Sequence, residues 1–160
     1  MQTLGSTPTT LLWEQEINLL QLAEIAARVA ECLATESRFC LWLTGDLGSG
    51  KTTLTGEILR QLGLDARIPV TSPTFTYINE YSLKDKNGSQ HWYAHLDLYR
   101  LGDDASLEEL GLADSRDFRG YFVEWPEVLP GDYLIQPTHR MDIAYGKNAD
   151  SPTRVYRFFT

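Results

Sequence analysis

Cysteine is scarce in this chain, since Cys32 and Cys40 are the only two among 160 residues. A disulfide between them is one interpretation, but a chain of this length can bury a sufficient apolar core without a cross-link. Apolar residues make up 42% of the sequence, which is typical of a globular protein and not of a disordered one. We therefore expect one folded domain that contains two ordinary buried thiols.

Positive charge and long apolar runs are also in short supply. Lysine and arginine number 14 against 22 aspartate and glutamate residues, and the formal net charge is −8. Because nucleic acid backbones are bound mainly through lysine and arginine, we expect no DNA binding by this chain. The first residues contain no basic region followed by an apolar run, and no stretch approaches the length of a membrane span. We expect a soluble cytoplasmic protein with no membrane contact.

Helical and strand-like patterns alternate along the chain. Residues 1–12 are polar and are expected to form a flexible N-terminal segment, followed by a single domain over 13–160. Apolar spacing predicts a helix over 14–34 and another over 51–62, which ends before Gly63. Strands are predicted over 39–44, 74–81, 91–99, 121–124, 133–136, 141–145 and 154–159, and a short helix over 107–110. The pattern predicts an α/β fold with a compact mixed sheet flanked by helices.

The stretch GDLGSGKTT, Gly45 to Thr53, fits the phosphate-binding pattern G-x-x-x-x-G-K-[ST]. Glycines let the backbone bend and approach a phosphate, and the N-terminus of the following helix favours negative charge. Lys51 supplies a charge for the β- and γ-phosphates, and Thr52 offers a hydroxyl to Mg²⁺. The motif follows a predicted buried strand and opens a predicted helix, as this mechanism requires. The sequence therefore predicts that these residues bind a nucleotide: Gly45, Asp46, Leu47, Gly48, Ser49, Gly50, Lys51, Thr52 and Thr53.

Two acidic residues stand at the ends of predicted strands. Asp97 follows WYAHL, and Glu124 ends YFVE. Ligands of an open α/β sheet bind at the carboxyl ends of its strands, and nucleotide hydrolysis uses a carboxylate beside the metal ion. We therefore assign Asp97 and Glu124 to catalysis together with Lys51, although ordinary strand-end acids exposed to water are the alternative. His91 and His95 are four residues apart with no third ligand, and we expect no zinc site there.

Five short segments occur in a characteristic order: GDLGSGKTT, SPTFT, HLDLYRL, EELGL and VEWPE. Together they closely resemble the bacterial TsaE family, also called YjeE. The phosphate loop alone is widespread, whereas DLYRL and EWPE are not general features of phosphate-loop proteins. The resemblance runs from about Glu14 to Leu129, which is most of the chain.

The resemblance implies a P-loop NTPase-like fold and a slow ATPase that binds ATP or ADP with Mg²⁺. It also implies an accessory role beside a TsaB–TsaD pair, which transfers a threonylcarbamoyl group to adenosine 37 of tRNA, so that any tRNA contact is indirect. By the same resemblance, Thr52 and Asp97 lie on the metal side of the site, and Thr74 belongs to a switch segment near the γ-phosphate. Glu124 and Trp125 match the family's EW motif, at the site and at a partner surface.

Three other functions share the phosphate loop. A small-molecule or nucleotide kinase usually adds a mobile lid that bears arginines, whereas the C-terminal third is predicted as strands and Arg116, Arg119 and Arg140 are scattered. A GTP-dependent switch usually carries N-K-x-D, which is absent from this sequence. A scaffold that is stabilised by a nucleotide without turnover is also compatible with these residues.

Overall fold

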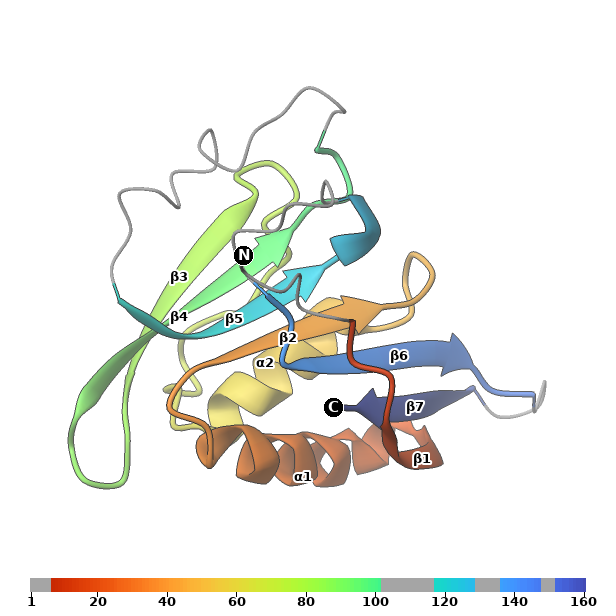
Figure 1. Cartoon of the computed structure of the whole chain (residues 1–160), viewed down its shortest axis with the longest axis horizontal. Helices are drawn as coiled ribbons and strands as arrows, with labels where there is room; N and C mark the ends of the chain where they lie inside the picture. The colour runs from red at the N-terminus through yellow and green to blue at the C-terminus, as the bar shows by residue number, and fades with distance from the viewer. Residues whose placement is uncertain (1–6, 102–116, 129–135, 148–151) are drawn as a thin grey trace, which may run out of the picture.

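The computed structural model describes residues 7–101, 117–128, 136–147 and 152–160 (Figure 1). The predicted helix over 107–110, the EELGL segment and most of the predicted strand over 133–136 lie outside these ranges. Within them, none of the helices combines the length and the apolar character that a membrane span requires.

Seven strands form one mixed sheet in the order β1-β7-β6-β2-β5-β4-β3 (Figure 1). The strands are β1 (Leu11–Asn18), β2 (Phe39–Thr44), β3 (Ile78–Lys84), β4 (Gln90–Asp97), β5 (Phe118–Glu124), β6 (His139–Tyr145) and β7 (Thr153–Phe159). The helices are α1 (Leu22–Ala34) and α2 (Lys51–Gln61), with short 3-10 turns η1 (Leu19–Gln21) and η3 (Pro126–Val128). The predicted α/β class with a mixed sheet is confirmed.

The four central strands are parallel and set the position of the site. Strand β2 pairs in parallel with β5 and β6, and β4 pairs in parallel with β5. Antiparallel strands close the two sides, with β3 beside β4 and with β7 and β1 beyond β6. The carboxyl ends of β2, β4, β5 and β6 therefore meet at one edge of the sheet, which is where open α/β sheets bind ligands.

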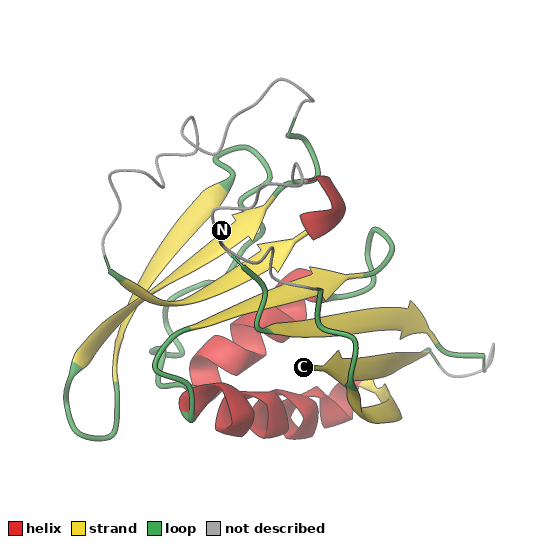
Figure 2. Cartoon of the chain, viewed as in Figure 1, coloured by secondary structure: helices red, strands yellow, loops and turns green. Residues whose placement is uncertain are grey.

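Both α-helices cover the same face of the sheet (Figure 2). Side chains alternate along β2, so that Leu41 and Leu43 join the core under the helices while Cys40 and Trp42 join an apolar cluster on the other face. This two-sided burial explains the continuous apolar run FCLWLT. Cys32 and Cys40 are both free thiols, as the sequence predicted, but only Cys40 is buried, whereas Cys32 is half-buried.

The predicted helix over 14–34 is wrong in its first part. Residues Leu11–Asn18 form the edge strand β1, which pairs with β7, and α1 begins only at Leu22. A capping box at Asn18, in which its side chain accepts from Leu20 N–H, separates the two elements. Leu20, placed by the prediction on the apolar face, is 95% exposed. Pairing with β7, which is distant in sequence, overrides the local helical spacing.

The predicted strand over 74–81 starts too early. Strand β3 begins at Ile78, and the preceding residues form a turn in which Tyr77 N–H donates to the carbonyl of Pro73 (2.6 Å). Tyr77 has a φ of 63°, a left-handed conformation that non-glycine residues rarely adopt. The turn therefore redirects Ser72 to Thr76 over the carboxyl end of β4, where Asp97 N–H donates to the carbonyl of Tyr77 (3.1 Å).

Candidate functional site

The site is assembled from the carboxyl ends of three adjacent parallel strands. The phosphate loop follows β2, and the last residues of β4 and β5 are Asp97 and Glu124. Asp97 lies opposite Glu124 in the register, and Glu124 lies opposite Leu43 of β2. The sequence could place each acid at a strand end, and the register now places the two acids side by side next to the phosphate loop.

The phosphate loop depends on glycine at defined positions. Gly45, Gly48 and Gly50 have φ angles of 143°, 77° and 105°, all in the region that favours glycine. At Gly45 a Cβ atom would also lie 2.4 Å from the carbonyl oxygen of Ile143 on β6. The loop is therefore held close to β6 in a conformation that other residues do not fit.

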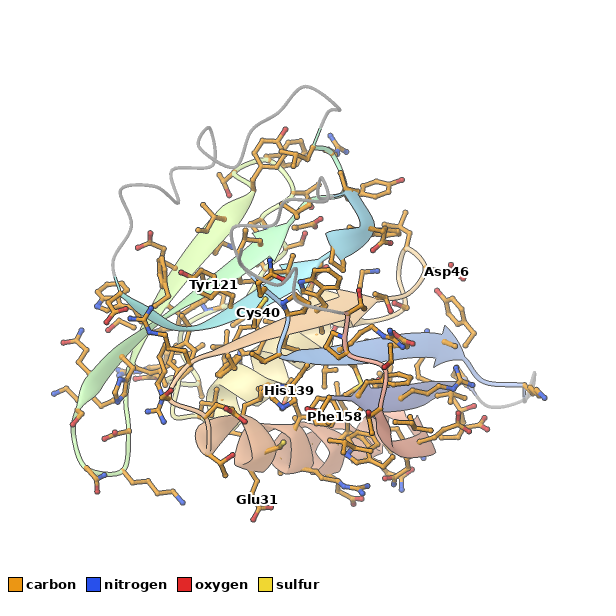
Figure 3. All side chains as sticks on the ribbon, in the orientation of Figure 1. Glu31, Cys40, Asp46, Tyr121, His139 and Phe158 are labelled. Carbon is orange, nitrogen blue, oxygen red and sulfur yellow. The ribbon has the colours of Figure 1, made fainter. Side chains whose placement is uncertain are left out.

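A cavity of about 470 Å³ opens between the loop and the strand ends. It is lined by Leu47, Gly48, Gly50, Lys51, Thr52, Thr53, Ser72, Thr74, Asp97, Tyr99, Arg100, Glu124 and Trp125. Of the site residues predicted from the sequence, only Gly45, Asp46 and Ser49 are not part of this lining. Asp46 lies at the outer edge of the loop (Figure 3), and Ser49 is buried beneath it.

Lys51 begins α2 and is held inside the site. Its Nζ donates to the carbonyl oxygens of Gly45 (2.7 Å) and Asp46 (3.0 Å) and lies 4.1 Å from the ring centroid of Trp125. Burial lowers the pKa of Lys51 below its usual value, and nearby acids, Glu124 foremost, oppose that shift. The ammonium group thus lies in a partly desolvated place where its attraction for phosphate oxygens is strong.

Glu124 is hydrogen-bonded to the residue that follows the lysine. Thr52 Oγ1 donates to Glu124 Oε1 (2.7 Å), and His95 Nε2 approaches the same oxygen at 2.7 Å. Both Glu124 and His95 are buried. The sequence paired Thr52 with Asp97 on the metal side, and both residues line the cavity, but the carboxylate in contact with Thr52 is that of Glu124.

Asp97 organises the loop that contains the SPTFT segment. Its Oδ2 accepts hydrogen bonds from the hydroxyls of Ser72 and Thr74, the latter at 3.1 Å. Its Oδ1 accepts from the backbone N–H of Tyr99 (3.0 Å). Thr74, predicted to lie near the γ-phosphate, is thereby attached to the carboxylate at the end of β4.

Aromatic residues form the mouth of the cavity. Trp125 has a φ of 59°, and its ring lies 4.8 Å from that of Tyr99, centroid to centroid. The guanidinium of Arg100 lies 4.7 Å from the ring centroid of Phe75, which is 81% exposed. A left-handed backbone at a bulky residue costs on the order of 1–3 kcal/mol and is concentrated at functional sites. The conformation of Trp125 directs its indole towards Lys51.

Two residues on β6 and β7 donate hydrogen bonds to carbonyl groups of the phosphate loop. Tyr145 Oη donates to the carbonyl of Leu47 (3.2 Å), and Arg154 Nε donates to that of Ser49 (3.3 Å). The Arg154 guanidinium also lies 4.1 Å from the ring centroid of Tyr145. Sequence reasoning missed both residues, together with His95, because their roles follow from strand pairing and not from any local pattern.

The oxygen ligands around the cavity suit Mg²⁺. A threonine hydroxyl and two carboxylates are hard donors, and Mg²⁺ in nucleotide sites is held by one or two such groups together with phosphates and waters. Within the described residues, no group of three or more His, Cys, Asp or Glu side chains is arranged to hold a metal by itself. The donor set therefore fits a Mg²⁺ ion whose remaining ligands are phosphate oxygens and waters.

The comparisons with known proteins agree on one family. The family model described as "Threonylcarbamoyl adenosine biosynthesis protein TsaE" matches residues 17–155. The chain belongs to the TsaE family. This match spans β2, β3, β4, β5 and β6 in full but only residues 17–18 of β1 and 153–155 of β7, so the TsaE family assignment covers the central strands and not only the phosphate loop.

Named relatives match this chain over between half and three quarters of their own length. The tRNA threonylcarbamoyladenosine biosynthesis protein TsaE of Haemophilus influenzae is 36% identical over 126 residues, 75% of each chain. The TsaE protein of Bacillus subtilis is 37% identical over 72% of this chain and 66% of its own length. That of Synechocystis is 43% identical over 55% of this chain and 54% of its own. The crystal structure of YdiB from Bacillus subtilis superposes with a TM-score of 0.59 at 26% identity, over 94% of this chain and 86% of that one.

Proposed function

We propose that this chain is a Mg²⁺-dependent ATPase of low turnover that assists a TsaB–TsaD pair in adding threonylcarbamoyl to adenosine 37 of tRNA. The observation that carries the proposal is the single cavity in which a phosphate loop and two strand-end carboxylates meet in a TsaE-family chain. Because tRNA modification of this kind takes place where tRNA is used, we also propose that the protein works in the cytoplasm.

In this proposal the phosphate loop binds ATP and ADP through residues 45–53. Lys51 Nζ exchanges its contacts with the Gly45 and Asp46 carbonyls for phosphate oxygens, which are stronger acceptors for a cation. The N-terminus of α2 and the backbone N–H groups of the loop favour the same anion. Trp125 lies against Lys51 and bounds the phosphate end of the cavity.

The carboxylates of Asp97 and Glu124 have different roles in this proposal. Thr52 would hold Mg²⁺ through its hydroxyl oxygen, with Asp97 and Glu124 available to its water shell. When bound, Mg²⁺ supplies neutralising charge to the phosphates during transfer to water. The Asp97 carboxylate accepts hydrogen bonds from Ser72 and Thr74. A movement of this carboxylate would therefore also move the switch segment. Glu124 is placed to orient Thr52 and to accept hydrogen bonds from water in the cavity.

Exposed apolar side chains at the cavity mouth support a protein partner. Leu47 (67% exposed) and Tyr99 line the cavity, and the exposed Phe75 lies against Arg100, which also lines it. Exposed apolar groups gathered around a site are typical of interaction surfaces. The net charge of −8 favours contact with proteins over direct contact with tRNA. We therefore propose that TsaB–TsaD docks near the nucleotide and influences its turnover.

The test is ATP turnover by the purified protein, alone and then with a TsaB–TsaD pair from the same organism. We expect low Mg²⁺-dependent turnover alone and a clear rise with the pair. Turnover that the pair does not change would contradict the accessory role and would favour a kinase, for which a phosphate acceptor would then be sought. No hydrolysis in either condition would favour a nucleotide-stabilised scaffold.

A further inference from the structure

A buried histidine lies behind the cavity at a position where packing alone would place an apolar residue. His95 is on β4, two residues before Asp97, and its side chain is 0% exposed. Tyr93, on the same face of β4, and Phe122, opposite His95 on β5, belong to the core under the helices. A polar side chain buried in such a core has a cost unless its hydrogen bonds are met, so its presence points to a specific task.

The hydrogen bonds of His95 lead to the site. Its Nε2 lies 2.7 Å from Glu124 Oε1, and Thr52 Oγ1 lies 2.7 Å from that same oxygen. A carboxylate only accepts hydrogen bonds, so Nε2 carries the hydrogen. Two donors from two different elements, β4 and α2, therefore converge on one oxygen of a residue at the end of β5.

The rest of the imidazole makes no comparable bond. His95 Nδ1 is buried and has no hydrogen-bond partner among the described residues. With the hydrogen on Nε2, Nδ1 is an acceptor that stays buried without a partner, so the contact with Glu124 is what holds the ring in place. Within the described part of the chain, the Glu124 carboxylate is thus the only group that is hydrogen-bonded to the His95 ring.

We propose that His95 is a positioning residue that fixes the Glu124 carboxylate against the Thr52 hydroxyl, a role that rests on the proposed function. With Oε1 held by His95, the hydroxyl hydrogen of Thr52 has a fixed acceptor, and the lone pairs of its oxygen remain for Mg²⁺. Without His95, the buried carboxylate loses one of its two donors and its orientation is no longer set by the sheet. His95 therefore contributes to Mg²⁺ binding without touching the ion or the nucleotide.

The experiment compares two substitutions of similar size. His95→Gln keeps an N–H donor, whereas His95→Met fills a similar volume and donates nothing. ADP affinity is measured by calorimetry in EDTA and across a Mg²⁺ series, with thermal melts to verify folding. We expect equal ADP affinity in EDTA for both variants and the wild type. We expect His95→Met to raise the half-saturating Mg²⁺ concentration by roughly tenfold or more, the size seen when a residue supporting a metal ligand is lost, and His95→Gln to stay near the wild type.

The outcomes separate this role from the proposed function. Equal Mg²⁺ half-saturation in the Gln and Met variants would overturn the positioning role, because only one of them donates a hydrogen bond. Wild-type protein that binds no ADP, or binds it without regard to Mg²⁺, would overturn the proposed function itself, whatever the variants do.

A second measurement tests whether His95 acts through Glu124. In a Glu124→Ala background, which removes the acceptor of the His95 hydrogen bond, His95→Met should change the Mg²⁺ half-saturation by less than about twofold, because residues in one hydrogen-bonded unit are not additive. An effect as large as in the wild-type background would show that His95 acts independently of Glu124 and would overturn the proposal.

Discussion

Two cavities of similar size lie at opposite ends of the parallel strands. The first, of about 470 Å³, holds the phosphate loop and the carboxyl ends of β4 and β5. The second, of about 500 Å³, lies between the side of α1, the last residues of α2 and the turn between β3 and β4. Both contain charged side chains, with Lys51, Asp97 and Glu124 in the first and Glu31, Asp85, Lys86 and Arg119 in the second.

The two cavities have similar volumes but differ in their position relative to α2, and the proposed phosphate site rests on that position. The first cavity receives the N-terminus of α2 and a loop rich in glycine, which both favour phosphate. The second receives Gln61 and Leu62 at the carboxyl end of the same helix, where the helix dipole disfavours anions, and none of the described residues that line it is glycine. The two ends of α2 therefore differ in their effect on a bound anion: the N-terminus favours it and the carboxyl end disfavours it.

The largest effect is expected from Lys51→Ala. Loss of two charged hydrogen bonds to phosphate, each contributing about 1.5–3 kcal/mol, should weaken ATP affinity by at least about 100-fold. Lys86→Ala in the second cavity is the matched control and should leave ATP affinity unchanged. Calorimetry on both variants checks this, and a Lys51 variant with wild-type affinity would remove the phosphate-loop assignment.

The second-largest effect is expected on the free energy of unfolding, from alanine substitutions at Gly45 and, for comparison, at Gly88. Gly45→Ala adds a Cβ 2.4 Å from a backbone carbonyl and forces alanine to a φ of 143°, so it should lower the free energy of unfolding by about 3 kcal/mol or more. Gly88→Ala, in the turn between β3 and β4, meets nothing within 4 Å and has only its φ of 82° to accommodate, about 1 kcal/mol. Urea unfolding of the two variants measures the difference, and equal losses would contradict the close approach of the loop to β6.

Glu124→Gln should separate turnover from binding. The amide keeps the shape of the side chain but removes the negative charge near Thr52, so ATP turnover should fall by roughly 10- to 100-fold while ADP affinity in EDTA changes little. Asp117→Asn, a change of charge alone at an exposed position before β5, serves as the control. Turnover at the wild-type level, alone and with TsaB–TsaD, would show that Glu124 has no catalytic part.

The smallest effect is expected on the pH dependence of stability, through the second buried histidine, His139. This residue lies at the start of β6, and its ring stacks on that of Phe158 (Figure 3). Burial lowers the pKa of His139 below its usual value of 6.5. As the pH falls below 6.5, the unfolded state takes up a proton that the folded state does not, so the free energy of unfolding falls. His139→Gln should flatten this dependence between about pH 7 and pH 5.5 in urea titrations, without altering ADP affinity. A steeper dependence in the variant would contradict the sign of the shift.

The sequence was sufficient for features that depend on short spacing. The phosphate loop, its strand and its helix were predicted because one local pattern contains all three. Glu124 was predicted at a strand end because the apolar run stops there, whereas the predicted strand over 91–99 ran two residues past Asp97, at which β4 ends. The contact between Thr52 and Glu124, which are 72 residues apart, depends on strand order, and spacing alone did not reveal it.

Features that depend on distant pairing were missed for the same reason. Residues 14–18 of β1 were predicted as helix and residues 11–12 as part of a flexible segment, because the partner strand β7 lies at the other end of the chain. His95 was noted only as half of an isolated pair with His91, although its hydrogen bond goes to β5 and that of His91 goes to Asp85 in the turn. Strand register, which no local pattern encodes, decides these contacts.

The central claim is that the nucleotide occupies the cavity at the carboxyl ends of the strands. An NMR titration of the isotope-labelled protein with Mg²⁺ and ADP tests it most directly, because each backbone amide reports separately. The account predicts that the amide shifts concentrate in residues 45–53, in the segment from Ser72 to Thr74, and at Trp125. Shifts concentrated instead at residues 85–88 beside the second cavity, or no shifts at all, would contradict it.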